Sequence, residues 1–340
     1  MDRRGFVSTG LAASLAGVAT GGSVLGAAWP RTPGWGVGKT QEDGTIRLSS
    51  NENALGLSPA AKQAVIDAIP IANRYPGRFR RPLMTTLAEH IGVKPENIVL
   101  SAGSTEILQV VTQVFQGPNV PMVLAEPTFE DINDYQDTQA FEVVAIPLTH
   151  DLAHDVGRMR EAASKRPSVV YFCNPNNPTG TITPSAEIDE WITEAPETTT
   201  FIMDEAYLEY ADDPRYWSAL KFVDTHPNVV VVRTFSKIFA MAGMRLGYSV
   251  SHPNTARRLA EFVVQNNPNV LASAAGLASL GDQGLIERSV AVNNESKKIV
   301  TQTLDERSHE LEEILRLLVR HEKPAAADRR RHVVGERECR

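Results

Sequence analysis

Residues 231–248 read V-V-R-T-F-S-K-I-F-A-M-A-G-M-R-L-G-Y. The apolar residues 229–232 predict a buried strand, and the polar residues 234–237 predict a turn after it. Lys237 ends this turn, and Arg245 follows eight residues later. A lysine amine can form a Schiff base, and hydroxyl and guanidinium groups suit a phosphate. The stretch therefore indicates a site for a carbonyl cofactor that carries a phosphate, although a surface lysine in a loop is the common explanation of a short S-K motif.

The composition is that of an ordinary soluble globular enzyme. The chain has 340 residues, of which 42% are hydrophobic and 22% are charged, and its net charge is −7. The negative charge argues against nucleic acid as the main partner. Cys173 and Cys339 are too few for a disulfide framework, and neither the cysteines nor the eight histidines have the spacing of metal ligands. We therefore expect no metal site, and we expect Cys173 to be a small core residue.

The first 28 residues are interpreted as a targeting segment. Residues 3–7 read R-R-G-F-V, and a weakly apolar run rich in Ala, Gly and Ser follows, with small residues at 26–28. This pattern resembles a twin-arginine signal peptide, which implies a soluble periplasmic product. A Sec signal and an uncleaved anchor are the alternatives. Because glycines interrupt the run, it is poorly suited to spanning a bilayer, and we expect no stable membrane insertion.

Two helices are predicted before residue 97. Residues 29–44 are rich in Gly, Pro and Thr and predict a linker, and residues 46–50 allow a short strand. Ser58 and Pro59 are an N-cap and a first-turn proline for a helix that ends near residue 69. Pro82 predicts the start of the second helix, which ends near residue 91.

From residue 97 onward, short apolar runs alternate with helix-length segments. The predicted strands are residues 98–100, 120–125, 141–146, 169–173, 199–203, 229–232 and 246–250. The predicted helices between them are residues 105–115, 128–138, 184–194 and 217–224. This alternation is typical of an α/β domain with a largely parallel sheet and helices on both faces. After Pro253 a helical pattern extends to about residue 319, with breaks near 266–268 and 281–284.

Three polar motifs follow predicted strands. Residues 101–106 (S-A-G-S-T-E) lie between a strand and a helix, where free N–H groups and the helix dipole favour an anion, although such a turn often only connects two elements. Residues 174–180 (N-P-N-N-P-T-G) form either a ligand loop at a strand end, in which the Asn177 amide could bind a ring oxygen, or a proline-braced turn. In residues 203–207 (M-D-E-A-Y), Asp204 either pairs with a ring nitrogen or caps a helix, and Tyr207 could bind the same ring oxygen.

The combination of these motifs resembles the fold-type I pyridoxal-phosphate (PLP) aminotransferases of classes I and II, with the greatest similarity to the histidinol-phosphate aminotransferase subgroup. The motifs N-P-N-N-P-T-G, D-E-A-Y and R-T-F-S-K-x-F-x-M-A-G-M-R-L-G-Y carry the resemblance, which covers about residues 47–302. N-E-N at 51–53 and R-Y-P at 74–76 match the subgroup as well. The resemblance implies a large domain with a mostly parallel seven-stranded sheet between helices, and a small domain built from N- and C-terminal segments.

The resemblance also implies PLP as cofactor and a role for individual residues. Lys237 matches the lysine that forms the Schiff base, and Asp204 matches the partner of the ring nitrogen. Asn177 and Tyr207 match the ligands of the ring hydroxyl, and Tyr207 is included among the catalytic residues. Phe129 matches the aromatic that stacks on the ring, where the family usually has Tyr.

The phosphate and the substrate are assigned to further residues by the same resemblance. The predicted phosphate ligands are Gly103, Ser104, Thr105, Thr234, Ser236 and Arg245. Tyr75 matches a tyrosine that reaches the phosphate of the neighbouring subunit, which implies a homodimer with shared active sites. Asn51 and Asn53 are the expected substrate residues.

The activity that the resemblance implies is ping-pong transamination between an amino acid or amino-phosphate donor and a 2-oxo acid acceptor. A PLP-dependent decarboxylase or lyase of the same fold is an alternative, because Lys237 and Asp204 do not decide which bond breaks. A non-catalytic PLP-binding protein is another, because the resemblance fades after about Leu304, where the family has an arginine clamp for the substrate. We expect a truncated or altered small domain for this reason.

The predicted domain organisation follows from these assignments. Residues 1–28 are the signal peptide, 29–44 the linker and 45–75 the N-terminal arm of the small domain. Residues 76–280 are the large PLP-binding domain, and 281–320 are the helical C-terminal segment of the small domain. Residues 321–340 are a charged tail, which we expect to be disordered because apolar periodicity stops there.

Overall fold

The computed structural model describes residues 49–306. The chain divides into two compact units, residues 1–51 and residues 52–340, and every element named below belongs to the second. Several predictions lie outside the described residues: the signal peptide (1–28), the linker (29–44), the charged tail (321–340), most of the strand at 46–50 and the helix beyond residue 306. The predicted boundaries between the small and large domains remain predictions.

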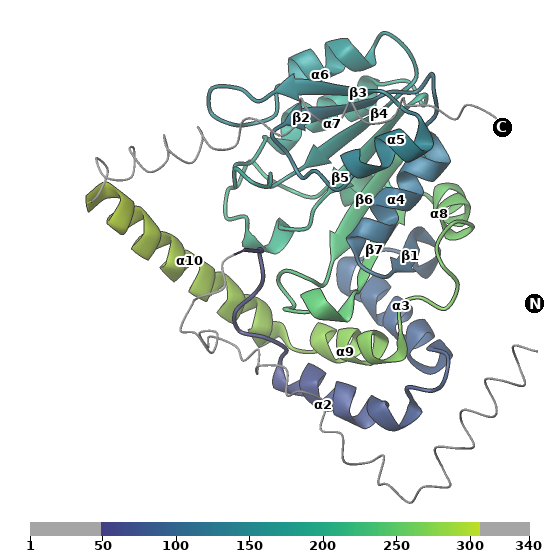
Figure 1. Ribbon diagram of the computed structural model, residues 1–340, viewed down its shortest axis with the longest axis vertical. Helices are drawn as coiled ribbons and strands as arrows, with labels where there is room; N and C mark the ends of the chain where they lie inside the picture. The colour runs from purple at the N-terminus through teal and green to yellow at the C-terminus, as the bar shows by residue number, and fades with distance from the viewer. Residues whose placement is uncertain (1–48, 307–340) are drawn as a thin grey trace, which may run out of the picture. The chain divides into compact units, whose positions relative to one another are not determined.

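A seven-stranded sheet forms the centre of the fold, as Figure 1 shows. Its order is β1-β7-β6-β5-β4-β2-β3. All neighbours are parallel except β7, which is antiparallel to both β1 and β6. The strands are β1 (Ile98–Ser101), β2 (Met122–Glu126), β3 (Val143–Pro147), β4 (Ser168–Cys173), β5 (Thr199–Asp204), β6 (Val229–Thr234) and β7 (Gly247–Ser251). The predicted α/β class with a largely parallel sheet is confirmed, and each of the seven strands predicted from residue 97 onward exists within two residues of its expected ends.

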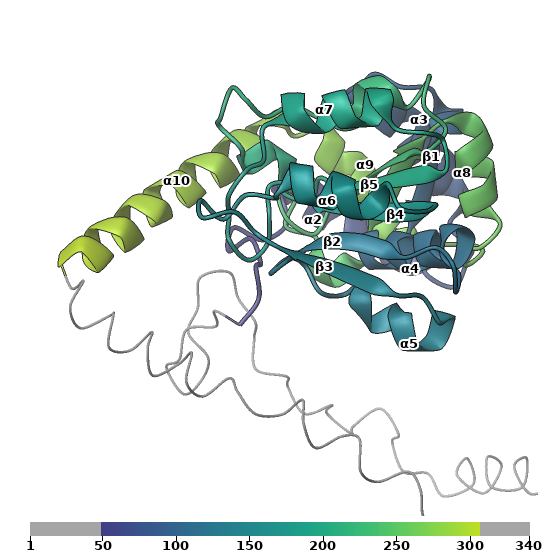
Figure 2. The same ribbon diagram turned by 90° about the horizontal axis from the view of Figure 1, so that it is seen from above.

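Helices cover both faces of the sheet, which explains why the central strands are apolar on both sides (Figures 1 and 2). Alternate strand residues enter opposite cores. On β4, Val170 and Phe172 contribute to the core beneath α3, α6, α7 and α9, whereas Val169 and Tyr171 contribute to the core beneath α4 and α8. These helices are α3 (Gly77–Ile91), α4 (Ser104–Phe115), α6 (Val156–Ala163), α7 (Ser185–Glu194), α8 (Pro253–Ala260) and α9 (Val270–Leu280).

The remaining helices lie at the start and the end of the described chain. In α2 (Pro59–Ala68), the Ser58 hydroxyl accepts a hydrogen bond from the Ala61 N–H, which is the predicted N-cap, and Pro59 occupies the first turn. Both α2 and α3 pack against α9. The last described helix is α10 (Gln283–Glu306). Within residues 49–306, no helix is long and apolar enough to cross a membrane.

Three helix predictions are corrected by the structure, and a fourth helix was not predicted. Helix α3 begins at Gly77 rather than Pro82, so it continues through a proline that lacks the N–H for its interior bond. Residues 128–138 form only a short 3₁₀ turn and α5 (Gln136–Gln139), because Thr128 is bonded to the 174–180 loop instead. Residues 217–224 contain only the 3₁₀ turn η6 (Ala219–Phe222), whose first N–H binds Glu205. Helix α6 was not predicted, since it has only eight residues.

Candidate active site

The predicted site residues lie at the carboxyl ends of adjoining parallel strands. Asp204 ends β5, where it pairs in register with Cys173 of β4 and Val232 of β6. The N-P-N-N-P-T-G loop begins directly after Cys173, and the turn that contains Lys237 begins after Thr234 of β6. Because these strands are neighbours, the three motifs meet at one edge of the sheet, where open α/β sheets bind ligands.

Lys237 lies in a partly buried position beside Tyr207. Its Nζ is 5.4 Å from the centre of the Tyr207 ring. Burial lowers the pKa of Lys237, and the charge of Arg245 acts in the same direction, whereas Asp204 and Glu52 oppose the shift. A lysine with a lowered pKa is more often in the neutral form, which is the nucleophile. The surroundings of Lys237 therefore suit it to attack a carbonyl group.

Asp204 is a buried carboxylate, with 2% of its surface exposed. The Tyr171 hydroxyl donates to Oδ2 at 2.9 Å, and the Ala206 N–H donates to Oδ1 at 3.1 Å. Burial raises the pKa of Asp204 to about 6, against the opposing effect of these two donors. Because Asp204 ends a strand and no α-helix follows it, the alternative role as a helix N-cap is not seen.

The residues of the predicted phosphate site converge at the start of α4. Gly103, with φ of +85°, precedes the helix, and a Cβ there would lie 2.4 Å from Arg245 Nη2. A Cβ on Gly247 would lie 2.3 Å from the Ser104 nitrogen. The backbone approaches this closely only because both positions are glycine. The first N–H groups of a helix have no partner inside it, so this end of α4 with the Arg245 guanidinium favours an anion.

Two further residues of the predicted phosphate site, Thr234 at the end of β6 and Ser236 after it, are bonded to each other. The Thr234 hydroxyl donates to the Ser236 hydroxyl at 2.9 Å, and the Ser236 N–H donates back to the Thr234 hydroxyl at 3.0 Å. Both residues are buried. The two hydroxyls are thus held in a tight turn directly before Lys237. Both residues were predicted to be phosphate ligands.

The two loops that carry Phe129, the predicted ring-stacking residue, and Asn177, a predicted ring ligand, are bonded together. The Thr128 hydroxyl donates to the Asn176 side chain at 2.8 Å, and the Asn176 amide donates to the Pro127 carbonyl at 3.2 Å. These bonds place Phe129 and Asn177 in adjoining loops. The backbone of Asn177 also hydrogen-bonds the Cys173 sulfur, beside Asp204.

The remaining predicted residues are less directly placed. The Asn53 amide donates to the Ile238 carbonyl at 3.1 Å and to the Ser289 hydroxyl at 2.8 Å, so it links the N-terminal arm to the residue after Lys237 and to α10. Its predicted contact with substrate stays a prediction. Asn51 belongs to the other compact unit, so its place relative to the site is not described. Tyr75 is 79% exposed.

Comparison with known proteins identifies the family of the chain. The family described as "Aminotransferase class I and II" matches residues 43–322. A histidinol-phosphate aminotransferase of Moorella thermoacetica is 36% identical over 273 residues, which are 79% of this chain and 70% of the relative.

The chain belongs to the class I and II aminotransferases.

Other relatives of this aminotransferase cover a similar share of the chain. An aromatic amino acid aminotransferase of Rhodococcus jostii is 36% identical over 257 residues, 75% of this chain and 71% of the relative. The crystal structure of histidinol-phosphate aminotransferase from Sinorhizobium meliloti in complex with pyridoxal-5'-phosphate has a TM-score of 0.72 at 26% identity, and the match covers 76% of this chain and 70% of that one. The aminotransferase is therefore PLP-dependent and histidinol-phosphate aminotransferase-like.

The residues of this aminotransferase fit PLP. A partly buried lysine of lowered pKa can hold the carbonyl carbon, and a buried carboxylate can hold the ring nitrogen. The glycine cradle before α4, which a Cβ would fill, leaves N–H groups and Arg245 for the phosphate. These residues thus offer partners for the carbonyl carbon, the ring nitrogen and the phosphate of the cofactor.

Sequence reasoning missed three residues near these groups. Tyr171 binds Asp204, and Asp131 accepts a bond from the Thr105 hydroxyl at 3.4 Å and raises the pKa of Lys237, as Glu52 does. A signal existed for Tyr171, because a tyrosine inside a buried strand needs a partner for its hydroxyl. Glu52 lies inside the N-E-N motif at 51–53, of which only the two asparagines were assigned to the site, whereas Asp131 lies in a segment predicted only to be helical.

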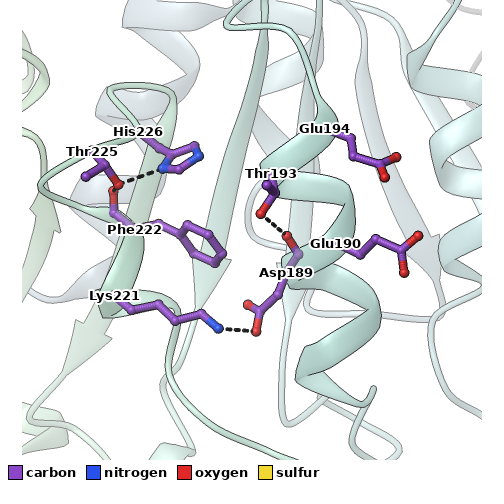
Figure 3. Close-up of a pocket in the computed structure, with 8 residues that line it drawn as sticks. All are labelled: Asp189, Glu190, Thr193, Glu194, Lys221, Phe222, Thr225 and His226. Atoms are coloured by element: carbon purple, nitrogen blue, oxygen red, sulfur yellow. Dashed lines mark hydrogen bonds and ion pairs between the residues drawn. The ribbon is translucent and has the colours of Figure 1, made fainter.

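Figure 3 shows a surface hollow of about 480 Å³ away from these motifs. It lies between α7 and the segment 221–226, and an ion pair between Asp189 and Lys221 crosses it. None of its lining residues is a predicted site residue, so the hollow is not assigned to catalysis. Within residues 49–306, no group of three or more His, Cys, Asp and Glu side chains could hold a metal ion.

Proposed function

We propose that this aminotransferase moves an amino group, in two half-reactions, from a small phosphate-bearing amine or an amino acid to a 2-oxo acid. The meeting of Lys237 with the buried Asp204 at the ends of β5 and β6 carries the proposal. PLP, when bound, supplies a carbonyl carbon that condenses with amines and a ring that accepts electrons from the broken bond. The chain's own residues bind the substrate and move its protons.

Each residue has a distinct task in this scheme. Lys237 would hold the carbonyl carbon of the cofactor, and its amine, when free, would move the proton of the substrate α-carbon. The ionised Asp204 would hold the ring nitrogen in its protonated form. Asn177 and Tyr207 bind the ring oxygen, and Phe129 covers the ring face. The phosphate is held by the N–H groups of residues 103–105 with Thr234, Ser236 and Arg245.

The donor that we propose is L-histidinol phosphate, with glutamate and 2-oxoglutarate as the second pair. The name of the Moorella relative supports the phosphate-bearing donor. The Rhodococcus relative supports an aromatic amino acid as the competing donor, at the same identity. Substrate preference is therefore the first property to measure once cofactor binding is established.

An absorbance titration of the full chain with PLP tests the proposal. Wild type should develop the visible band of lysine-bound PLP, and L-glutamate or L-histidinol phosphate should abolish it, with formation of the 2-oxo acid from glutamate or the ketone phosphate from L-histidinol phosphate. Lys237→Ala should show no such band and lose activity by at least about 10³-fold. The control is Lys221→Ala, because Lys221 lies outside the site.

Each other outcome contradicts a part of the proposal. A band that no amine changes would indicate a non-catalytic PLP-binding protein. Release of CO₂ from an amino acid would indicate a decarboxylase. A visible band that persists in Lys237→Ala would overturn the assignment of Lys237.

We further propose that the enzyme is a homodimer and a periplasmic protein. The exposure of Tyr75, which the family resemblance assigns to the partner's phosphate, supports the first point. The R-R-G-F-V motif at residues 3–7 supports the second. Changing Arg3 and Arg4 together to lysine should retain the protein in the cytoplasm on cell fractionation. Unchanged export of that variant would contradict a twin-arginine route.

A further inference from the structure

Tyr171 is a buried tyrosine whose hydroxyl donates a hydrogen bond to a carboxylate of the candidate active site. Its exposed fraction is 0%, and its hydroxyl donates to Asp204 Oδ2 at 2.9 Å. A buried tyrosine hydroxyl needs a hydrogen-bond partner, and a backbone carbonyl is the usual one in a protein core. Here the partner is instead the Asp204 carboxylate, which is the proposed partner of the ring nitrogen.

The strand register explains how Tyr171 reaches this carboxylate. Tyr171 of β4 pairs with Ile202 of β5, and Asp204 lies two residues further along the same strand. Residues two apart on a strand point to the same face, so both side chains lie on the α4 side of the sheet. The long phenol therefore extends along the strand direction to the Asp204 carboxylate, two residues ahead.

The second carboxylate oxygen is bonded as well. The Ala206 N–H donates to Oδ1 at 3.1 Å, while Tyr171 donates to Oδ2. Two donors on different oxygens hold the carboxylate plane in one orientation. Both donors also favour the ionised carboxylate over the neutral acid.

We propose that Tyr171 is a positioning residue for Asp204. Its hydroxyl orients the carboxylate and keeps it ionised, so that Asp204 meets the ring nitrogen of the cofactor as a charged acceptor. This inference rests on the proposed role of Asp204 as the partner of that nitrogen.

The groups around Asp204 shift its pKa in both directions, so the loss of one hydrogen-bond donor should change it. Burial raises its pKa to about 6, and Glu205, the next residue, acts in the same direction. Tyr171 of β4 and Lys237 of the loop after β6 oppose that shift. Burial raises the pKa of both Tyr171 and its neighbour Cys173, so these two groups remain neutral and Asp204 is the group that titrates. Loss of the Tyr171 hydroxyl should therefore raise the pKa of Asp204 further.

The test is PLP binding by full-length wild type and Tyr171→Phe as a function of pH. Affinity should fall at acid pH where Asp204 is protonated, and Tyr171→Phe should move this acid limb upward by about one pH unit. The variant should then bind PLP about fivefold more weakly near pH 6, about tenfold more weakly well below it, and within about twofold of wild type near pH 8. Tyr248→Phe is the matched control, because Tyr248 is a buried tyrosine of β7 in the other core. It should leave the acid limb in place.

Three results separate the alternatives. An acid limb that moves only in Tyr171→Phe supports the proposal. A limb that stays in place, with affinity unchanged or equally reduced at every pH, would overturn it, because only a structural role would remain. If Asp204→Asn also leaves the acid limb in place, the role of Asp204 itself fails, and the proposed function fails at that residue.

A thermal double-mutant cycle keeps the proposal testable if Tyr171→Phe folds poorly. Tyr171→Phe should lower Tm in the wild-type chain because it leaves a buried charge with one donor fewer. In a chain that carries Asp204→Asn, the charge is gone, and at least half of that decrease should disappear. A decrease of equal size in both chains, or failure of the double variant to fold, would contradict the proposal.

Discussion

At Gly103 the backbone passes close to the Arg245 guanidinium. The φ of Gly103 is +85°, and an added Cβ would lie 2.4 Å from Nη2 and 2.9 Å from Cζ of Arg245. A side chain at this position would therefore strain the backbone and displace the guanidinium from the proposed phosphate site. Glycine is thus required at position 103 for two reasons: it permits the positive φ, and it leaves space for the Arg245 guanidinium.

Gly103→Ala should weaken PLP binding by about tenfold or more, because the phosphate loses both its guanidinium and the geometry of the loop. Equilibrium titration with PLP measures this. Gly92→Ala is the matched control: Gly92 has φ of +75°, but nothing lies within 4 Å of its added Cβ. That control should lower stability by about 1 kcal/mol and leave PLP affinity unchanged. Equal PLP affinities for Gly103→Ala and wild type would contradict the phosphate site.

His154 is a buried histidine outside the site. It is 3% exposed, its Nδ1 lies 2.8 Å from the Thr183 hydroxyl, and its Nε2 has no hydrogen-bond partner among the described residues. Burial lowers its pKa from 6.5 to about 4. A charged imidazole would be poorly accommodated there, so the folded protein keeps the ring neutral.

The free energy of unfolding should consequently decrease as the pH is lowered, because His154 becomes protonated more readily in the unfolded chain. The unfolded chain binds a proton near pH 6.5 and the folded protein only near pH 4, so the contribution of His154 is complete above pH 6.5 and is lost as the pH falls toward 4. The loss should reach about 3 kcal/mol of unfolding free energy. Urea unfolding of wild type and His154→Phe at several pH values isolates it as the difference between the two curves.

His150→Gln provides the control, because the His150 side chain is fully exposed. Its unfolding free energy should follow wild type across the same pH range. If the curves of wild type and His154→Phe remain parallel from pH 7 to pH 4.5, the buried neutral state of His154 is wrong.

At the scale of elements, an ion pair joins the ends of β5 and β6. Arg233 Nη2 lies 2.8 Å from Glu205 Oε2, with exposed side-chain fractions of 8% and 3%. The Ser218 hydroxyl and the Ala219 N–H also bind Glu205. Since neighbouring strand residues point to opposite faces, this pair lies behind the sheet from Asp204 and ties together the two strands that carry Asp204 and lead to Lys237.

Arg233→Met should lower the unfolding free energy by about 3–5 kcal/mol, because it leaves the Glu205 charge buried and unpaired. Chemical unfolding at neutral pH measures this value. Arg160→Met is the control, because Arg160 pairs with Glu194 at the surface, and its effect should stay within about 0.5 kcal/mol. A loss below about 1 kcal/mol for Arg233→Met would show that the pair contributes little to the strand ends.

At the scale of the whole molecule, shared active sites make a prediction about mixed subunits. Tyr75→Ala alone should reduce activity to about a tenth or less, because the partner's phosphate loses a donor. Co-expression of Tyr75→Ala with Lys237→Ala should give dimers in which one of the two sites is intact. Random pairing then restores about a quarter of wild-type activity.

Differently tagged subunits allow the mixed dimers to be purified and assayed, and sedimentation confirms their size. Co-expression of Lys237→Ala with Gly103→Ala is the control, because both residues serve the same subunit's site and no mixed dimer should regain an intact one. If the Tyr75 and Lys237 variants fail to complement, or if the enzyme sediments as a monomer, Tyr75 does not act across subunits.

Local sequence was sufficient for the strands and for the motif positions. The apolar runs at 169–173, 199–203 and 229–232 became β4, β5 and β6, because a strand buried on both faces needs no distant partner to be recognised. The motifs follow these strand ends, so the meeting of Lys237, Asp204 and Asn177 was predictable. The segment 128–138 was not, since its helical pattern yields to the bond between Thr128 and Asn176, 48 residues away.

The sequence by itself thus determined the α/β class, the strands and the chemistry of the site loops, because short-range periodicity and motif composition encode them. Tertiary structure alone decided which side chains serve those loops. Tyr171 reaches Asp204 across 33 residues of sequence, and Arg233 reaches Glu205 across 28. Arg245 lies against Gly103 only because β7 is inserted between β1 and β6. Such pairs depend on strand order and register. These are determined by the packing of the whole sheet and cannot be predicted from a local sequence pattern.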